Sequence, residues 1–172
     1  MEAESTIPVS QFLTELLDFP LCSQCALWLT ALFSMKRFEL IDISGDAGIR
    51  AFGEDLNDLF LNAAAGMYSL ITDPGSVSPN KTIEIKAEGS SREGLLVSWL
   101  NELIFHFDTY GFIGRVIHIH ELHNTLIKAS VTGEDFIPEK HGGGLLIKAA
   151  TYHKLKIERK EGRWEAEVIF DI

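Results

Sequence analysis

Basic residues are scarce in this sequence of 172 residues, which has 15 Lys and Arg against 25 Asp and Glu and a formal net charge of −10. A protein that holds bare nucleic acid by itself normally carries a basic patch, which displaces counterions from the phosphates. We therefore expect no stable direct binding of nucleic acid, although a local patch or a basic partner protein would still allow a role beside it.

Cysteine is rarer still: Cys22 and Cys25 are the only two, and they form one CxxC motif. Redox motifs of this spacing usually open a helix in a βαβ unit, and zinc sites usually need a second pair of ligands nearby. Neither context is present, so we interpret both as small apolar residues in an apolar segment. A low cysteine count suits a reducing compartment, and we expect a cytoplasmic protein.

The first 34 residues lack the features of export and membrane signals. They hold four acidic residues and no Lys or Arg, whereas a secretory signal needs a positive leader. Their apolar run, Phe19 to Ser34, is interrupted by Ser23 and Gln24 and is shorter than the about 20 residues that cross a membrane. We expect residues 1–34 to be an N-terminal appendage that need not belong to the native translation product. An amphipathic helix packed on the domain is the alternative, and no membrane contact is expected.

Residues 35–172 show patterns that predict a single α+β domain. Most of its strands are expected to be antiparallel, because short turns such as His123-Asn124 and Glu161-Gly162 join neighbouring apolar segments. The predicted strands are Arg37–Ile43, Ala47–Gly53, Lys81–Glu88, Arg115–Glu121, Thr125–Val131, Leu145–Ala150, Lys154–Arg159 and Arg163–Phe170.

Two amphipathic helices complete the predicted domain. The first follows an N-cap at Asp55, repeats its apolar residues at helical spacing, and stops before Pro74. The second opens with a capping box, in which Ser90 is followed three residues later by Glu93, and it ends near Gly111.

Several catalytic motifs are absent: the sequence has no GxxxxGK phosphate loop, no GxGxxG opening a helix and no HExxH. The quartet His141-Gly142-Gly143-Gly144 is similar to the oxyanion-hole loop of esterases. Such enzymes also need a GxSxG elbow that presents the nucleophile, and the sequence has none. We interpret the quartet as a flexible glycine loop, identify no catalytic nucleophile, and expect a protein that is not itself an enzyme.

Three histidines form a candidate zinc site. His118 and His120 are two residues apart on a predicted strand and so point to one face, with His123 in the adjoining turn. Zinc binds neutral imidazoles in such arrangements, together with a third histidine or a carboxylate. The same alternation also describes an ordinary solvated strand face. A zinc-dependent hydrolase that uses His118 and His120 is therefore kept as the alternative function.

A second candidate site consists of oxygen donors. Asp46 lies in the turn predicted between the first two strands, and Asp171 is next to last in the sequence. Period-2 alternation puts Phe170 and Ile172 on the core face of the last strand and Asp171 on the other face. A core-anchored Ile172 would hold its main-chain carboxylate still beside Asp171. If the last strand lies near Asp46, several oxygen ligands converge there, and Ca²⁺ and Mg²⁺ prefer such ligands. The alternative is that these acids are simply solvated.

Five segments together resemble the archease family, and the resemblance covers essentially all of residues 36–172. The segments are ISGDAGIRAFG (43–53), AAAGMYSLITD (63–73), WLNELIFHFDT (99–109), IKAATYHKLKIE (147–158) and GRWEAEVIFDI (162–172). The Asp-Ile ending and the KA-TYH segment make the match specific, and residues 1–34 lie outside it.

This resemblance implies an activator of the RtcB-type RNA ligase, which joins tRNA halves in splicing and repairs broken RNA. Archeases assist guanylylation of that ligase and its repeated turnover. Their metal site, usually described as calcium-binding, uses the aspartate of an HTAD-like motif and the final Asp-Ile, which correspond here to Asp46, Asp171 and Ile172. Ca²⁺ is therefore the expected cofactor, with Mg²⁺ and Mn²⁺ as alternatives, and the ligase is the expected partner.

The sequence departs from the family pattern at three places. It has Ile43-Ser44-Gly45 where the family commonly has His-Thr-Ala, Ile137 where it often has Asp, and Leu146 where a glutamate is common. These departures leave Asp46 and the Asp-Ile ending intact, but they change the residues around them. The matching segments also contain three residues to which the sequence assigns no role, Asp108, Lys148 and His153, and His141 in the glycine quartet is a fourth such residue.

Overall fold

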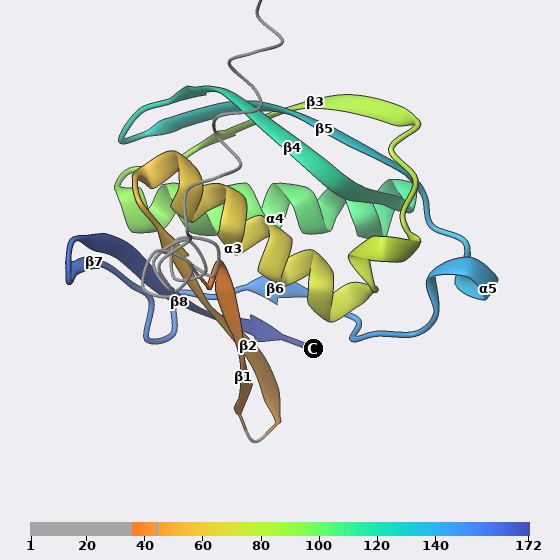
Figure 1. The fold of residues 1–172 in the computed structure, drawn as a ribbon, viewed down its shortest axis with the longest axis horizontal. Coiled ribbons are helices and arrows are strands. Elements are labelled where there is room, and N and C mark those ends of the chain that lie inside the picture. Colours follow the sequence, from red (N-terminus) through yellow and green to blue (C-terminus); the bar gives the residue numbers. More distant parts are fainter. Residues whose placement is uncertain (1–35, 44) are drawn as a thin grey trace, which may run out of the picture. The chain divides into compact units, whose positions relative to one another are not determined.

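The structure is a computed structural model, and it describes residues 36–43 and 45–172 (Figure 1). The predicted appendage and the pair Cys22 and Cys25 lie outside the described residues. Within residues 36–172 the chain forms two antiparallel sheets and two long helices, so the predicted α+β class is confirmed. No helix of the described part is long and apolar enough to cross a membrane.

The first sheet joins the two ends of the domain. Its strand order is β1-β2-β8-β6, and β7 also pairs with β8. All these pairs are antiparallel. The strands of this sheet are β1 (Phe38–Ile43), β2 (Asp46–Gly53), β6 (Ala149–Ala150), β7 (Lys156–Lys160) and β8 (Arg163–Asp171).

The second sheet comes from the middle of the chain and has the order β3-β5-β4. Its strands are β3 (Lys81–Glu88), β4 (Phe112–Leu122) and β5 (Leu126–Asp135). Figure 1 shows the helices between this sheet and the first one. Helix α3 (Leu56–Ile71) contacts β2 and β4, and α4 (Arg92–Tyr110) contacts β3 and β6, so each helix touches both sheets.

Both helices begin and end at residues suited to these positions. The Asp55 carboxylate caps α3 by accepting a hydrogen bond from the Asp58 N–H at 2.9 Å. At α4 the prediction was wrong by one residue, because Ser91 rather than Ser90 is the N-cap, and its hydroxyl accepts from the Gly94 N–H at 3.0 Å. Gly111, with φ of 65°, ends α4 in the left-handed conformation that glycine adopts without strain.

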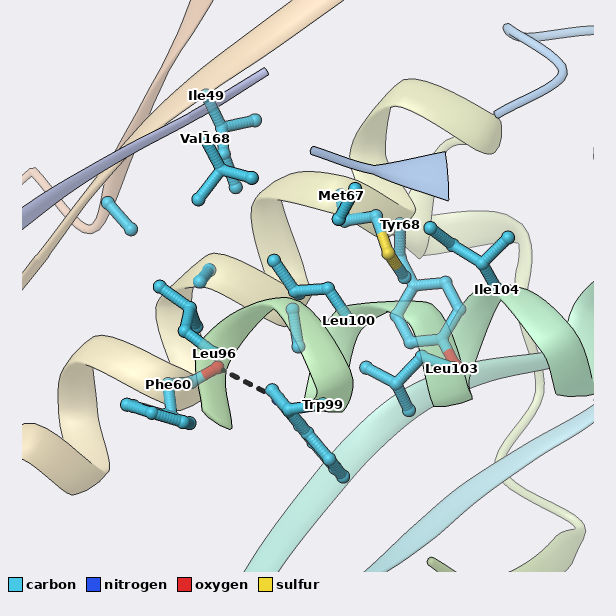
Figure 2. Close-up of a cluster of buried hydrophobic side chains, with 14 of the residues drawn as sticks. Ile49, Phe60, Met67, Tyr68, Leu96, Trp99, Leu100, Leu103, Ile104 and Val168 are labelled. Atoms are coloured by element: carbon cyan, nitrogen blue, oxygen red, sulfur yellow. Dashed lines mark hydrogen bonds between the residues drawn. The ribbon is translucent and has the colours of Figure 1, made fainter. Parts of the chain in front are cut away.

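The core fills the space between the sheets and around the helices (Figure 2). Its largest fully buried side chains include Trp99 and Leu100 of α4 and Phe60 of α3. The Trp99 indole N–H points to the main-chain oxygen of Phe60 at 3.4 Å, so it has a polar partner although it is buried. Ile49 of β2 and Val168 of β8 are also fully buried, which attaches the first sheet to the helices.

The main differences from the predicted strands lie after residue 135. The strand predicted at Leu145–Ala150 is reduced to the two residues of β6, because the Leu145 N–H donates to the main-chain oxygen of Leu70 at the end of α3 instead of to a strand. A short helix that the sequence did not predict, α5 (Pro138–His141), precedes this loop. Strand β7 begins later than expected, after Lys154 adopts a φ of 54° in a turn.

Candidate functional site

The pairing of β2 with β8 brings two of the predicted ligands together. In this antiparallel register Ala47 lies opposite Phe170. Continuing the register by one residue puts Asp46 opposite Asp171. On its other side, Asp46 pairs with Ile43 of β1, so it lies at the end of the β1–β2 hairpin. Two aspartates far apart in the sequence thus occupy neighbouring positions at one end of the sheet.

Both carboxylates belong to the outer face of this sheet. Val168 and Phe170 are fully buried on the inner face, so alternation turns Asp171 to the opposite side, and it is exposed. Asp46 is exposed as well. Side chains at directly opposed positions of an antiparallel pair have Cβ atoms about 5 Å apart, and like charges there repel. The pair is therefore a place of excess negative charge that a cation would relieve.

Ile172 packs partly buried against the core, as the strand alternation predicted. Its main-chain oxygen accepts a hydrogen bond from the Lys148 Nζ at 2.9 Å. The Lys148 main-chain N–H donates to the oxygen of Asp171 at 2.8 Å. Lys148, to which the sequence assigned no role, therefore holds the end of β8 with both its backbone and its ammonium group.

The chemistry of this donor set suits a hard cation. Two carboxylates and a main-chain oxygen are oxygen ligands of the kind that Ca²⁺ and Mg²⁺ prefer. Across residues 36–43 and 45–172, no group of three or more His, Cys, Asp or Glu side chains is arranged to hold a metal ion. A site here would thus depend on two side chains and one main-chain oxygen, with the remaining positions open.

The histidines of the alternative zinc site lie on the outer face of the second sheet. The rings of His118 and His120 have centroids 4.8 Å apart, and both residues are exposed. His120 Nε2 is 3.0 Å from the Ser130 hydroxyl and 3.8 Å from a Glu84 carboxylate oxygen. Because no trio within the described residues is arranged as metal ligands, this pair lacks the third ligand that a catalytic zinc needs.

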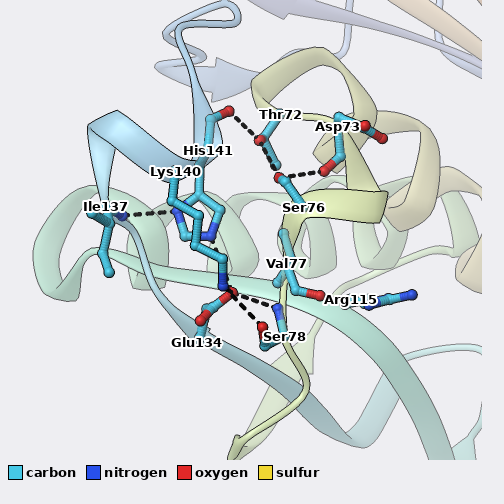
Figure 3. Close-up of polar contacts among 10 residues, drawn as sticks. All are labelled: Thr72, Asp73, Ser76, Val77, Ser78, Arg115, Glu134, Ile137, Lys140 and His141. Carbon is cyan, nitrogen blue, oxygen red and sulfur yellow. Dashed lines mark hydrogen bonds and ion pairs between the residues drawn. The ribbon is translucent and has the colours of Figure 1, made fainter.

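A buried polar cluster that the sequence did not indicate lies between β5, α5 and the loop after α3 (Figure 3). One carboxylate oxygen of Glu134 accepts from the Lys140 ammonium at 2.5 Å, from the Ser78 N–H, and from His141 Nε2 at 3.1 Å. Lys140 and the Ser78 N–H in particular stabilise the ionised form and lower the pKa of Glu134 to about 2. Glu134 is therefore a carboxylate whose charge is satisfied within the chain.

His141 is held in one neutral form by its neighbours. The Ile137 N–H donates to His141 Nδ1 at 2.8 Å, so that nitrogen carries no proton and Nε2 carries the one that points to Glu134. The His141 ring stacks on Phe136, and its main-chain oxygen accepts from the Thr72 hydroxyl at 2.6 Å. The first residue of the predicted glycine loop is thus an anchor that ties α5 to the end of α3.

A second charged network covers the outer face of the first sheet, at a hollow of about 160 Å³. At its centre the Arg50 guanidinium is 2.9 Å from a Glu167 carboxylate oxygen, and it also approaches Glu165. The hydrogen bond with Glu167 raises the pKa of Arg50. Lys156 and Lys160 pair with carboxylates as well, so the charges of this hollow largely cancel.

The remaining residues without an assigned role are exposed. Asp108 lies in the last turn of α4, and His153 lies in the turn between β6 and β7. The structure does not bring either residue into the polar clusters described above.

Comparison with known proteins shows the family of this chain. The model of the archease protein family matches residues 38–172. The chain belongs to the archease family. It is 33% identical over 139 residues to the archease of Sulfurisphaera tokodaii, which covers 80% of this chain and 100% of that protein. It is 34% identical over 138 residues to the archease of Methanopyrus kandleri, over 78% of this chain and 99% of that protein.

Solved structures share the archease fold. The solution structure of protein 1598 of Methanobacterium thermoautotrophicum has a TM-score of 0.63 and 34% identity, over 80% of this chain and all of that one. The crystal structure of an archease of Thermotoga maritima, described as a possible chaperone, has a TM-score of 0.56 over 78% of this chain and 96% of that one. At 20% identity the second likeness concerns the fold alone.

Proposed function

We propose that this archease family member activates an RtcB-type RNA ligase in tRNA splicing and RNA repair. In this role it promotes the guanylylation of the ligase, its covalent loading with GMP, and supports repeated turnover. The observation that carries the proposal is the register of β2 and β8, which sets Asp46 opposite Asp171 at an exposed end of the sheet. Among residues 36–43 and 45–172, no Lys or Arg side chain pairs with either aspartate, and stability alone does not explain two facing carboxylates without such a partner.

A Ca²⁺-type cation is the proposed cofactor of this end of the sheet, with Mg²⁺ and Mn²⁺ as alternatives. Asp46, Asp171 and the main-chain oxygen of Ile172 would hold it, and Lys148 would position that oxygen through its hydrogen bond. Such a cation, bound through few protein ligands, supplies open positions for the phosphate oxygens of a nucleotide. The activator then needs no nucleophile of its own, because the covalent chemistry takes place on the ligase.

The charge of the chain supports such a partner. An RNA ligase must be basic around the site that holds RNA, and a chain with a net charge of −10 is attracted to such a surface. Association of this kind is steered electrostatically and weakens as salt screens the charges. The acidic composition that disfavours direct RNA binding thus favours contact with a protein that binds RNA.

The test is transfer of GMP from GTP to a purified RtcB-type ligase at limiting metal, followed as covalent radiolabel on the ligase. We expect Asp46→Asn to reduce the stimulation at least tenfold, which is typical of lost metal-site groups. Asp42→Asn is the matched control, because it removes an exposed acid from the same hairpin at a position paired with Ala47. Equal stimulation by wild type and Asp46→Asn would reject the metal site. Absence of any stimulation by the wild type would reject the function.

A further inference from the structure

The last turns of α4 carry an exposed aromatic surface that the proposed metal site does not use. Phe105 and Tyr110 are 47% and 61% exposed, and their rings meet edge to face with centroids 5.8 Å apart. The His106 ring lies 5.9 Å from Phe105 and 5.5 Å from Tyr110. We call Phe105, His106 and Tyr110 the α4 aromatic cluster.

A third exposed apolar side chain lies in the segment that is bonded to the end of α4. The Phe136 N–H donates to the main-chain oxygen of Gly111, which brings the start of α5 beside the end of α4. Ile137, the next residue, is 47% exposed. Because the aromatic rings already contact one another, a partner that covers them would immobilise few side chains that are free beforehand. Aromatic residues ordered in this way are the usual anchors of protein interfaces.

The stretch of sequence that carries the cluster has acidic residues and no Lys or Arg. No Lys or Arg occurs from Glu93 to Gly114, while Glu102 and Asp108 lie in the second half of α4. Helices usually place bases in their last turn, where the dipole is negative, but α4 has none and carries Asp108 there instead. Lys81, whose ammonium group lies 5.9 Å from the centre of the Phe112 ring just after α4, is paired with Asp135, and Lys140 of α5 is paired with Glu134.

We propose that the α4 aromatic cluster, with Asp108 and Ile137, is a docking surface for a protein partner that presents arginine or lysine side chains. A guanidinium or ammonium group would stack on the exposed ring faces and pair with Asp108, and it would supply the positive charge that the end of α4 lacks. The inference rests on the proposed function to the extent that it takes this partner to be the basic RNA ligase. In this proposal, the α4 aromatic cluster contributes the affinity for the ligase, and the Asp46–Asp171 end of the sheet is responsible for its activation.

The experiment measures binding of the full chain to an intact RtcB-type ligase by biolayer interferometry and, in parallel, GMP transfer over a range of activator concentrations. We expect the double variant Phe105→Ala/Tyr110→Ala to weaken binding at least tenfold, and to raise the half-maximal activating concentration by the same factor without lowering the maximum. Asp108→Asn should weaken binding about threefold and reduce its dependence on salt. Val116→Ala, which shortens a side chain that is 51% exposed on β4, is the control and should bind as the wild type does.

The outcomes separate the two proposals. Asp46→Asn should bind with unchanged affinity and fail to activate, which is the opposite of the aromatic double variant. If the double variant, with unchanged thermal unfolding, binds and activates like the wild type, the docking surface is wrong and the proposed function stands. If the double variant and Val116→Ala weaken binding equally, the assignment to α4 is also wrong. If the wild type neither binds nor activates the ligase, both proposals fail.

Discussion

Two carboxylate clusters of this molecule differ in how completely the chain satisfies them. Glu134 is buried, and Lys140, His141 and the Ser78 N–H all contact one of its oxygens. Asp46 and Asp171 face each other in the open, and the only ammonium group described beside them, that of Lys148, bonds to the main-chain oxygen of Ile172. Burial and a shifted pKa thus mark a structural cluster in this molecule, whereas unbalanced charge marks the surface available to another molecule.

Removing the buried histidine is expected to give the largest effect on stability. The change His141→Ala deletes a fully buried ring, leaves the Ile137 N–H without its acceptor, and removes one hydrogen bond to Glu134. We expect a loss of about 3 kcal/mol in the free energy of unfolding, measured by urea denaturation. His153→Ala, at an exposed histidine, should change it by less than about 0.5 kcal/mol. Equal losses for both variants would mean that the cluster does not hold α5 in place.

The second-largest effect is expected from acid, which should lower the free energy of unfolding by protonating Glu134. The folded state lowers the pKa of Glu134 from its ordinary value of 4.5 to about 2. Glu134 therefore stabilises the fold fully above about pH 5, and this contribution is lost as the pH falls toward 2. In urea denaturation between pH 6 and pH 3, we expect the wild type to lose more stability than Glu134→Gln, which has no carboxylate to protonate. Parallel curves would contradict this assignment.

A calcium ion bound at Asp46 and Asp171 should stabilise the protein by less than the two effects above. At a concentration ten times its Kd, one bound ion adds about 1.4 kcal/mol to the free energy of unfolding. Calorimetry should show a rise in Tm with Ca²⁺ for the wild type and none for Asp46→Asn. Lys148→Gln should keep the rise but require a severalfold higher Ca²⁺ concentration, because the hydrogen bond that positions the main-chain oxygen of Ile172 is lost. A Ca²⁺ response in Asp46→Asn as large as that of the wild type would remove the distinction between the two clusters.

The sequence predicted the regular elements well where local signals agreed. Helix α3 runs from Leu56 to Ile71 as its apolar spacing and Asp55 indicated, and β3 has the predicted bounds of Lys81 and Glu88. At the start of α4, the adjacent residues Ser90 and Ser91 both carry a hydroxyl that could cap the helix. A tertiary contact constrains the entry to this helix, because the Gly89 N–H donates to the main-chain oxygen of Thr125 at 3.0 Å. Capping patterns cannot express such a contact.

The polar clusters depend on contacts between distant segments, which the sequence alone could not predict. Alternation on the last strand correctly turned Phe170 inward and packed Ile172 against the core. It could not show which strand lies beside β8, because that choice depends on long-range packing. The Glu134 cluster was missed for a related reason: its members come from β5, α5 and the segment after α3, and no short motif joins them. Residues 1–34 stay a prediction, since the described residues begin at Lys36.

The pairing of β2 with β8 also sets the order in which the protein can be built. The second sheet and α4 come from one continuous stretch, from Lys81 to Asp135, so they can assemble while later residues are still being synthesised. The first sheet must wait, because β2 finds its neighbour only once β8 has left the ribosome. Asp46 and Asp171 can therefore meet only after β8 has been synthesised. A nascent or truncated chain that lacks β8 would present no paired carboxylates to the partner.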